Sequence, residues 1–191
     1  MCSGSIFDCH FLNYIKMKKC LLALSVAVLI SATGFTQVTG GDYKAGVGLR
    51  LGGGNYDVVA ASLKVFPRVQ SAFEFNLGFK PYGGYGRFGN GWTNVSASAS
   101  YQHHFPIGNI EGFKWFIGGG LTAYHTFSKY DDYRGFGLGI FPTGGAEYKF
   151  PGIPLAVSAD LRPTISVVKP YDYYDGFYIG NFGIAARYTF R

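Results

Sequence analysis

After residue 42 the chain is a succession of segments in which hydrophobic and polar residues alternate. In the first segment Tyr43, Ala45, Val47, Leu49 and Leu51 form an apolar row opposite small and charged residues. Seven further segments repeat the pattern and start near residues 59, 73, 94, 114, 138, 155 and 181. A period of two is typical of a β-strand with one apolar face, and no stretch keeps the 3.6-residue period of a helix. The sequence therefore predicts eight β-strands.

The two faces of these strands distinguish a soluble barrel from a membrane barrel. One face carries large aliphatic and aromatic residues and no charge, whereas the other is rich in Gly, Ser, Asn and Thr with one or two charges per strand. A soluble barrel needs a charged outer face, and this polar face carries too little charge for that. Small polar residues fit the narrow interior of a barrel whose apolar face meets lipid. We therefore predict an all-β fold, an eight-stranded antiparallel up-and-down transmembrane β-barrel.

Two prolines lie within these strands. Pro142 falls in the sixth strand and Pro163 in the seventh. A closed barrel has no free edge that could accommodate a missing N–H donor. We therefore expect a bulge or local break at residues 141–145, where Gly144 and Gly145 could absorb the bend. Pro163 is expected near the outer end of its strand.

The connections between the strands alternate in length and composition. Those after the third, fifth and seventh strands, at residues 80–91, 126–136 and 166–176, are long and carry Tyr, Asp and Gly, whereas the first, at 53–57, is short. The other connections, at 67–69, 106–112 and 151–154, are shorter and open with proline, a turn former. Long loops outside and tight turns inside are typical of a bacterial outer-membrane barrel, so both chain ends are expected in the periplasm.

The N-terminal residues have the parts of a cleavable signal peptide. Lys18 and Lys19 precede an apolar run at residues 20–30, and the small residues of 31–34 follow it. We expect Met17 to be the initiator, with a longer leader from Met1 as the alternative, and cleavage between residues 34 and 37. Residues 1–36 are then extension and signal peptide, and residues 37–191 are the barrel domain. All three cysteines lie in the leader, so the mature chain is expected to have no disulfide, catalytic thiol or cysteine-bound zinc.

Composition and charge exclude further classes of protein. The chain is 48% hydrophobic and 18% aromatic but only 15% charged, against about 25% in an average soluble domain. With 29 glycines, 15 tyrosines and 18 phenylalanines, it suits neither a helical bundle nor a disordered chain. The net charge of +6 falls to +4 without the leader. Its basic residues are scattered singly, so no nucleic-acid partner is predicted.

The inward rows contain charges of both signs, which we expect to form a paired network that plugs the interior. An eight-stranded barrel is just wide enough inside for side chains to fill it. A polar pathway through the barrel is the alternative. The residues assigned to the network are Arg50, Lys64, Glu74, Glu147, Asp160, Arg162 and Arg187.

Aromatic residues gather at the strand ends, where a membrane protein has its interfacial girdles. The main girdle residues predicted are Phe79, Trp92, Phe105, Trp115, Phe150, Tyr188 and Phe190. Phe66 at the turn end and Tyr82, Phe127, Phe136 and Phe177 at the loop end are assigned to the same girdles.

Two loops combine tyrosine and aspartate, side chains suited to contact a protein, a glycan or a divalent cation at the cell surface. A solvated loop with no ligand is the alternative. The loop residues assigned to contacts are Tyr130, Asp131, Asp132, Tyr133, Tyr171, Asp172, Tyr173, Tyr174 and Asp175. No cofactor and no bound metal are predicted.

The histidines of the mature chain are the candidates for an enzymatic role. They are His103, His104 and His125. A general base needs an oriented partner and a nucleophile within hydrogen-bond reach, and the sequence offers no such set. We therefore predict no catalytic residue.

The mature chain resembles the small eight-stranded outer-membrane barrels of the OmpX and OmpA-transmembrane-domain type. The resemblance rests on the strand pattern from Tyr43 onward and on the C-terminal segment 184–190, which looks like the assembly signal of that family. In the family this signal usually ends on the aromatic residue, whereas here Arg191 follows Phe190. The resemblance implies an exported outer-membrane protein that contacts outer-membrane lipid and lipopolysaccharide and meets the assembly machinery through its C-terminal strand.

The role expected from these features is structural or one of surface interaction, through extracellular loops that contact a protein or glycan. A small-molecule conduit of the OmpW type is one alternative, and a lipid A-modifying hydrolase on the same fold is another. The inward charges argue against a conduit, which would require a lateral opening or a continuous apolar interior.

Overall fold

The computed structural model describes residues 43–82, 92–108, 110–128, 134–172 and 174–191. The strand segments are β1 (Ala45–Gly52), β2 (Val59–Arg68), β3 (Ser71–Tyr82), β4 (Trp92–Pro106), β5 (Phe113–Phe127), β6 (Gly135–Lys149), β7 (Leu155–Leu161), β8 (Thr164–Val168), β9 (Phe177–Tyr178) and β10 (Phe182–Phe190). No helix in the described part of the chain is long and apolar enough to cross a membrane. The expected signal peptide, residues 1–36, lies outside the described residues.

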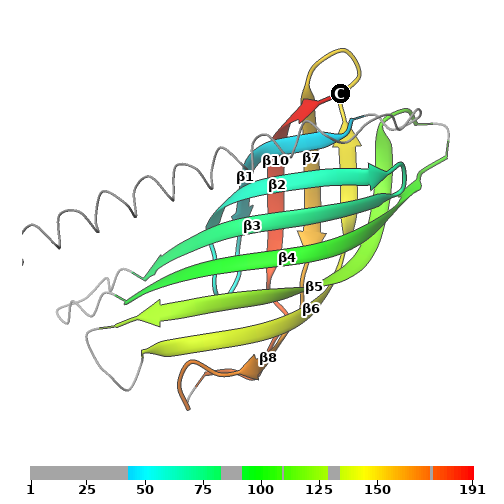
Figure 1. Ribbon diagram of the computed structural model, residues 1–191. Helices are drawn as coiled ribbons and strands as arrows, with labels where there is room; N and C mark the ends of the chain where they lie inside the picture. Colours follow the sequence, from blue (N-terminus) through cyan, green and yellow to red (C-terminus); the bar gives the residue numbers. More distant parts are fainter. Residues whose placement is uncertain (1–42, 83–91, 109, 129–133, 173) are drawn as a thin grey trace, which may run out of the picture. The chain divides into compact units, whose positions relative to one another are not determined.

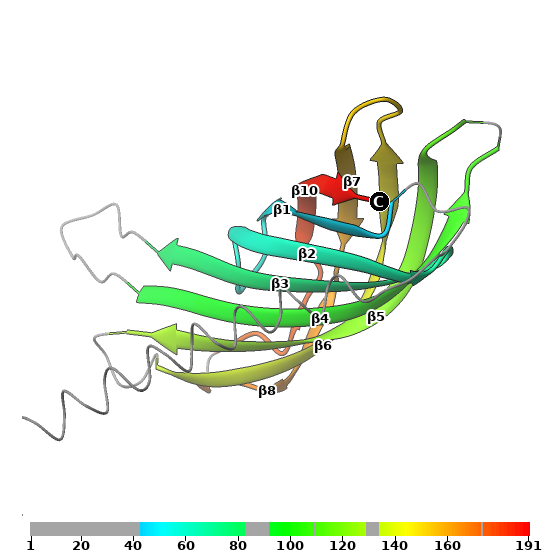
Figure 2. The same ribbon diagram turned by 45° about the horizontal axis from the view of Figure 1, so that its top comes forward.

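These segments form a closed antiparallel barrel of eight strands, as the alternation predicts. Consecutive strands β1 to β6 pair as neighbours, β6 pairs with β7 and β8, and β10 pairs with both β7 and β1, which closes the sheet. Segments β7 and β8 are one strand interrupted at residues 162 and 163, and β9 and β10 are one strand interrupted at residues 179–181. Figure 1 shows β1 to β6 side by side, and Figure 2 shows β10 between β1 and β7.

The barrel is apolar outside and polar inside. Among the described residues, 24 buried side chains are polar or charged and 11 are hydrophobic. Large hydrophobic side chains line the outer face of every long strand, with Leu77 69% exposed and Leu121 65% exposed. This is the reverse of a water-soluble domain, in which buried positions are mostly apolar. The alternation in β10 is complete, because every second residue from Gly183 to Thr189 is buried.

The two prolines act on the barrel differently from the sequence-based expectation. Strand β6 runs without a bulge through Pro142, whose Cα partner in β5 is Gly119. The chain itself leaves the strand at Pro163, which stands in the middle of the seventh strand and not near its outer end. A bulge at 141–145 is therefore absent, but a local break is present on one side of β6, because its ladder has no pairs between Gly144 and Ile140, where Pro142 faces Pro163. Inward and outward positions keep their order through both prolines because Phe141, Thr143 and Arg162 are all buried.

Candidate functional site: a charge network inside the barrel

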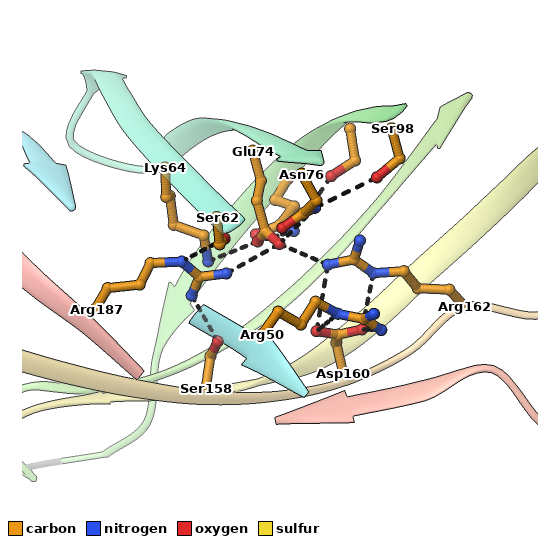
Figure 3. A network of polar contacts seen from close by, with 12 residues as sticks. Arg50, Ser62, Lys64, Glu74, Asn76, Ser98, Ser158, Asp160, Arg162 and Arg187 are labelled. Atoms are coloured by element: carbon orange, nitrogen blue, oxygen red, sulfur yellow. Dashed lines mark hydrogen bonds and ion pairs between the residues drawn. The ribbon is translucent and has the colours of Figure 1, made fainter. Parts of the chain in front are cut away.

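Glu74 of β3 lies at the centre of a network of buried charges. Its Oε1 contacts Arg162 Nη2 at 2.6 Å and Arg187 Nη2 at 2.9 Å, and its Oε2 lies 3.4 Å from Lys64 Nζ. Gln102 also donates to Oε2 at 2.9 Å. In Figure 3 the two guanidinium groups approach Glu74 from opposite sides. One carboxylate therefore lies within ion-pair distance of three cations that come from different parts of the chain.

Asp160 of β7 is the second anionic centre. Arg50 of β1 donates to it through Nη2 at 2.8 Å and through Nε at 3.2 Å, so both carboxylate oxygens are used. Arg162, which follows β7, places Nε 2.7 Å from Asp160 Oδ1. Arg162 thereby joins the Asp160 group to the Glu74 group.

The network continues toward the turn end of the barrel through Glu147 of β6. Lys64 Nζ lies 2.7 Å from Glu147 Oε2, and Tyr43 donates its hydroxyl to Oε1 at 2.8 Å. Arg187 connects this end to the rest through Glu74 and also donates to the hydroxyls of Ser62 and Ser158. Lys64 thus bridges Glu74 and Glu147.

Toward the loop end the network reaches Asp57, in the connection between β1 and β2. Its Oδ1 lies 3.5 Å from Arg50 Nη1. Burial raises the pKa of the Asp57 carboxyl, while neighbouring Arg50 acts in the opposite direction. Asp57 is therefore held more weakly than Glu74 or Asp160.

The described network is balanced in formal charge. Its cations are Arg50, Lys64, Arg162 and Arg187, and its anions are Asp57, Glu74, Glu147 and Asp160. All eight side chains are at most 2% exposed. Burying a charge costs several kcal/mol unless a partner and further hydrogen bonds compensate. Every charge in this set has an oppositely charged partner within 4.0 Å.

Glycines make room for the charged side chains. A Cβ at Gly52 would lie 2.9 Å from Arg50 Nη1, and one at Gly183 would overlap the same guanidinium. A Cβ at Gly78 would lie 3.0 Å from Asp57 Oδ2. Inward glycines near these large ionic side chains therefore let them fit inside a narrow barrel.

Tyrosines pack together near the loop end of the interior. Tyr56 stacks on Tyr124 with ring centroids 5.7 Å apart, and Tyr174 lies 5.5 Å from Tyr124. Tyr171 packs edge-on against Tyr174. The assignment of Tyr174 to external contacts is therefore wrong, because its side chain is only 7% exposed. Asp172 and Asp175 of the same loop are exposed.

A second aromatic group packs inside the barrel near the turn end. Phe66 contacts Tyr43 and His104 with ring centroids 4.9 Å apart in each case, and His104 lies 5.0 Å from Phe116. The assignment of Phe66 to a girdle is wrong because its side chain is buried inside the barrel. Tyr43, expected in the outward row, also turns inward, since it precedes β1 and is not bound by the alternation of the strand.

The other girdle residues that are described lie on the outer face. Near the turn end, Phe105 stacks on Trp115 with ring centroids 4.3 Å apart, and Tyr188 and Phe190 contact each other. Phe150 contacts Tyr148 there. At the loop end, Phe79, Phe127, Phe136 and Phe177 are exposed.

Several assigned positions fall outside the described residues. They are Tyr130, Asp131, Asp132, Tyr133 and Tyr173, and the side chains of Tyr82 and Trp92.

The structure brings all seven predicted network residues together and adds two that the sequence did not indicate. Asp57 lies in a connection and Tyr43 before the first strand, where alternation assigns no face. The sequence offered one indication that Asp57 lies near Arg50, because the turn of a two-strand hairpin brings the residues on its two sides close together. Nothing in the sequence indicated that Tyr43 joins the network, because its hydrogen bond to Glu147 connects residues 104 positions apart.

No protein-family model matches the chain, and no curated protein sequence matches it.

Proposed function

We propose that the protein is an integral outer-membrane barrel whose interior is plugged by the charge network. The observation that carries this proposal is the inverted polarity of the barrel, with exposed hydrophobic residues around the outer wall and balanced ions inside. Such an outer wall would drive aggregation in water, whereas a bilayer solvates it. The outward aromatic residues near both ends support the same placement.

The network favours a plug over a conduit of the OmpW type. The cations and anions bridge strands from opposite sides of the barrel, such as β3 and the end of β7 through Glu74 and Arg162. A solute would have to separate several ion pairs at once, and each charge left without its partner in a low-dielectric interior is costly. The resemblance to OmpX-type barrels is consistent with this proposal.

Conductance in planar lipid bilayers tests the plug. The wild-type protein should insert and show no steady open pore at moderate voltage. A matched pair of variants, Glu74→Gln inside the barrel and Glu111→Gln in the exposed turn after β4, should differ, because only the first leaves buried cations with one anion fewer. A steady wild-type pore, or identical records for the two variants, would contradict the plug.

The role proposed for the molecule is structural support or surface interaction through its loops. Asp172 and Asp175 are exposed at the loop end and available to a protein or glycan, whereas Tyr174 packs inward. The test compares binding in a protein pull-down and a glycan screen before and after Asp172→Ser, Asp175→Ser and replacement of residues 130–133 by Gly and Ser. Loss of a wild-type ligand supports the interaction role; unchanged binding, or none at the start, leaves the structural role as the better account.

A further inference from the structure

The apolar outer wall of the barrel carries a row of polar side chains near the turn end. Arg68 of β2 is the Cα partner of Ser71 in β3, and Ser71 is the Cα partner of His103 in β4. Figures 1 and 2 show these three strands side by side. On the outward rows of the described strands, Arg68 is the only charged residue and Ser71 the only serine. The row therefore differs from the rest of the wall, which is mainly aliphatic and aromatic.

A change of register in β2 places Arg68 on the outer face. Simple alternation would put Arg68 on the inward row, two residues after the buried Phe66. The register of β2 against β3 shifts between Val65 and Arg68, and an extra residue in one strand moves the following positions to the other face. Cross-strand partners share a face, and Ser71 belongs to the outward row of Phe73. Arg68 is accordingly exposed at the end of the strand.

Two hydroxyl groups and an imidazole lie beside this arginine. The Tyr101 hydroxyl, on the outward row of β4, is 3.0 Å from Ser71 Oγ. Only one of the two can donate to the other, so the second keeps its hydrogen for another acceptor. The imidazole of His103 packs edge-on against Phe105 with ring centroids 4.7 Å apart. We call Arg68, Ser71, Tyr101 and His103 the outer polar group.

The outer polar group has a positive charge and no carboxylate. No ion pair within the described part of the chain includes Arg68. Neighbouring cross-strand side chains have Cβ atoms about 5 Å apart, so the row from Arg68 to His103 spans about 10 Å. A guanidinium group binds phosphate oxygens through paired N–H donors, and a free hydroxyl can donate to the same acceptor. The group therefore has the donors and the dimensions to hold one phosphate.

We propose that the outer polar group binds the phosphate of a phospholipid head group in the membrane leaflet at the turn end of the barrel. The site rests on the proposed function, since only a barrel in a bilayer meets that leaflet. The stacked rings of Phe105 and Trp115 lie on the same part of the outer wall, where an aromatic girdle meets the head groups. The outer polar group is thus at the level at which lipid phosphates lie.

The chemistry of the site favours an anionic head group over a zwitterionic one. Phosphatidylcholine and phosphatidylethanolamine carry a cation beside the phosphate, and the outer polar group offers no carboxylate to receive it. Phosphatidylglycerol carries the phosphate charge alone. Phe73, which is 44% exposed and packs edge-on against Tyr101, provides an apolar surface next to the site for the chains of the same lipid.

Lipid titration followed by native mass spectrometry tests the site. The full-length mature protein, folded in a non-ionic detergent, is titrated with phosphatidylglycerol or phosphatidylcholine, and the Kd of the first bound lipid is measured. The wild type should bind phosphatidylglycerol more tightly. Arg68→Gln should raise that Kd about fivefold or more. Arg134→Gln, which removes an exposed cation at the loop end just before β6, is the matched control and should leave it unchanged.

A second matched pair changes no charge. Tyr101→Phe removes a hydroxyl of the outer polar group and should raise the Kd for phosphatidylglycerol about twofold to tenfold, as expected for one hydrogen bond. Tyr188→Phe removes the hydroxyl of another exposed tyrosine near the turn end and should not change the Kd. Should Arg68→Gln not fold, the tyrosine pair decides the question.

The outcomes separate the lipid site from the membrane placement. Insertion into lipid vesicles, read from heat-modifiable gel mobility, tests the placement, and failure to insert overturns the proposed function and the site with it. Insertion with equal Kd values for the two lipids overturns the site alone. The site is also overturned when the variants of the outer polar group bind phosphatidylglycerol no more weakly than their controls.

Discussion

Glu74 is the anion that pairs with the largest number of buried cations in the described network. It contacts Arg162, Arg187 and Lys64, and Gln102 and Asn76 donate to it as well. Among the described anions, no other carboxylate is shared by three cations. Among these carboxylates, Glu74 is therefore the one whose substitution should destabilise the barrel most.

Glu74→Gln should lower the free energy of unfolding by about 3 to 5 kcal/mol, the cost expected when one partner of a buried ion pair is removed. Urea unfolding of the barrel in lipid vesicles measures this change. Glu111→Gln, at an exposed turn position, is the control and should change it little. Equal effects of the two substitutions would show that the buried pairs do not matter to stability.

Asp57 should behave differently from Glu74 and make stability depend on pH. Because burial raises its pKa in the folded barrel, its contribution is complete at a pH below the pKa of the unfolded chain and is lost as the pH rises through the folded value. The stability of the wild type relative to Asp57→Asn should therefore fall as the pH rises above the unfolded-state pKa of an aspartate, about 4. Urea unfolding of both proteins below and above that pH measures the difference, and a constant or rising difference would contradict this sign.

At the scale of the strand, alternation predicts faces well and register poorly. Every assigned network residue lies on the inward row, and the row continues through Pro142 and Pro163. Phe66 also follows the inward row of β2, and its assignment to a girdle came from its place at a strand end without regard to its row. That Pro142 faces Pro163 depends on strand register, which is set by the closed sheet and not by either segment alone.

Positions outside the strands show the other limit. Tyr43 and Tyr174 are placed by contacts with residues far away in the sequence, Glu147 and Tyr124 respectively. No local period assigns such residues a face. The strands were therefore predictable from the sequence, whereas the two aromatic groups at the ends of the interior were not.

Gly183→Ala tests how tightly the strands pack around the buried ions. The added methyl group would overlap the Arg50 guanidinium and displace it from Asp160, at a cost of about 1 to 3 kcal/mol. Gly119→Ala is the control, since its methyl group meets only ordinary contact on the outer face. Urea unfolding compares the two variants, and equal stability would mean that the interior has spare room beside Arg50.

For the molecule as a whole, the inverted polarity is the property from which the proposed roles follow. A chain with exposed Leu77 and Leu121 outside and paired Arg162 and Glu74 inside has its apolar surface where a soluble protein has its water-facing surface. The eight ions of the network carry no net formal charge, and each has an oppositely charged partner, which lowers the cost of burying them inside the barrel. The proposed plug and the proposed role of the loops both depend on this placement.

Fractionation of cells that produce the full-length chain tests the placement most directly. We predict that the protein sediments with the outer membrane in a density gradient and migrates faster on a gel before boiling than after it, as a folded barrel does. Recovery as a soluble monomer from the periplasm, with the same mobility before and after boiling, would contradict the account.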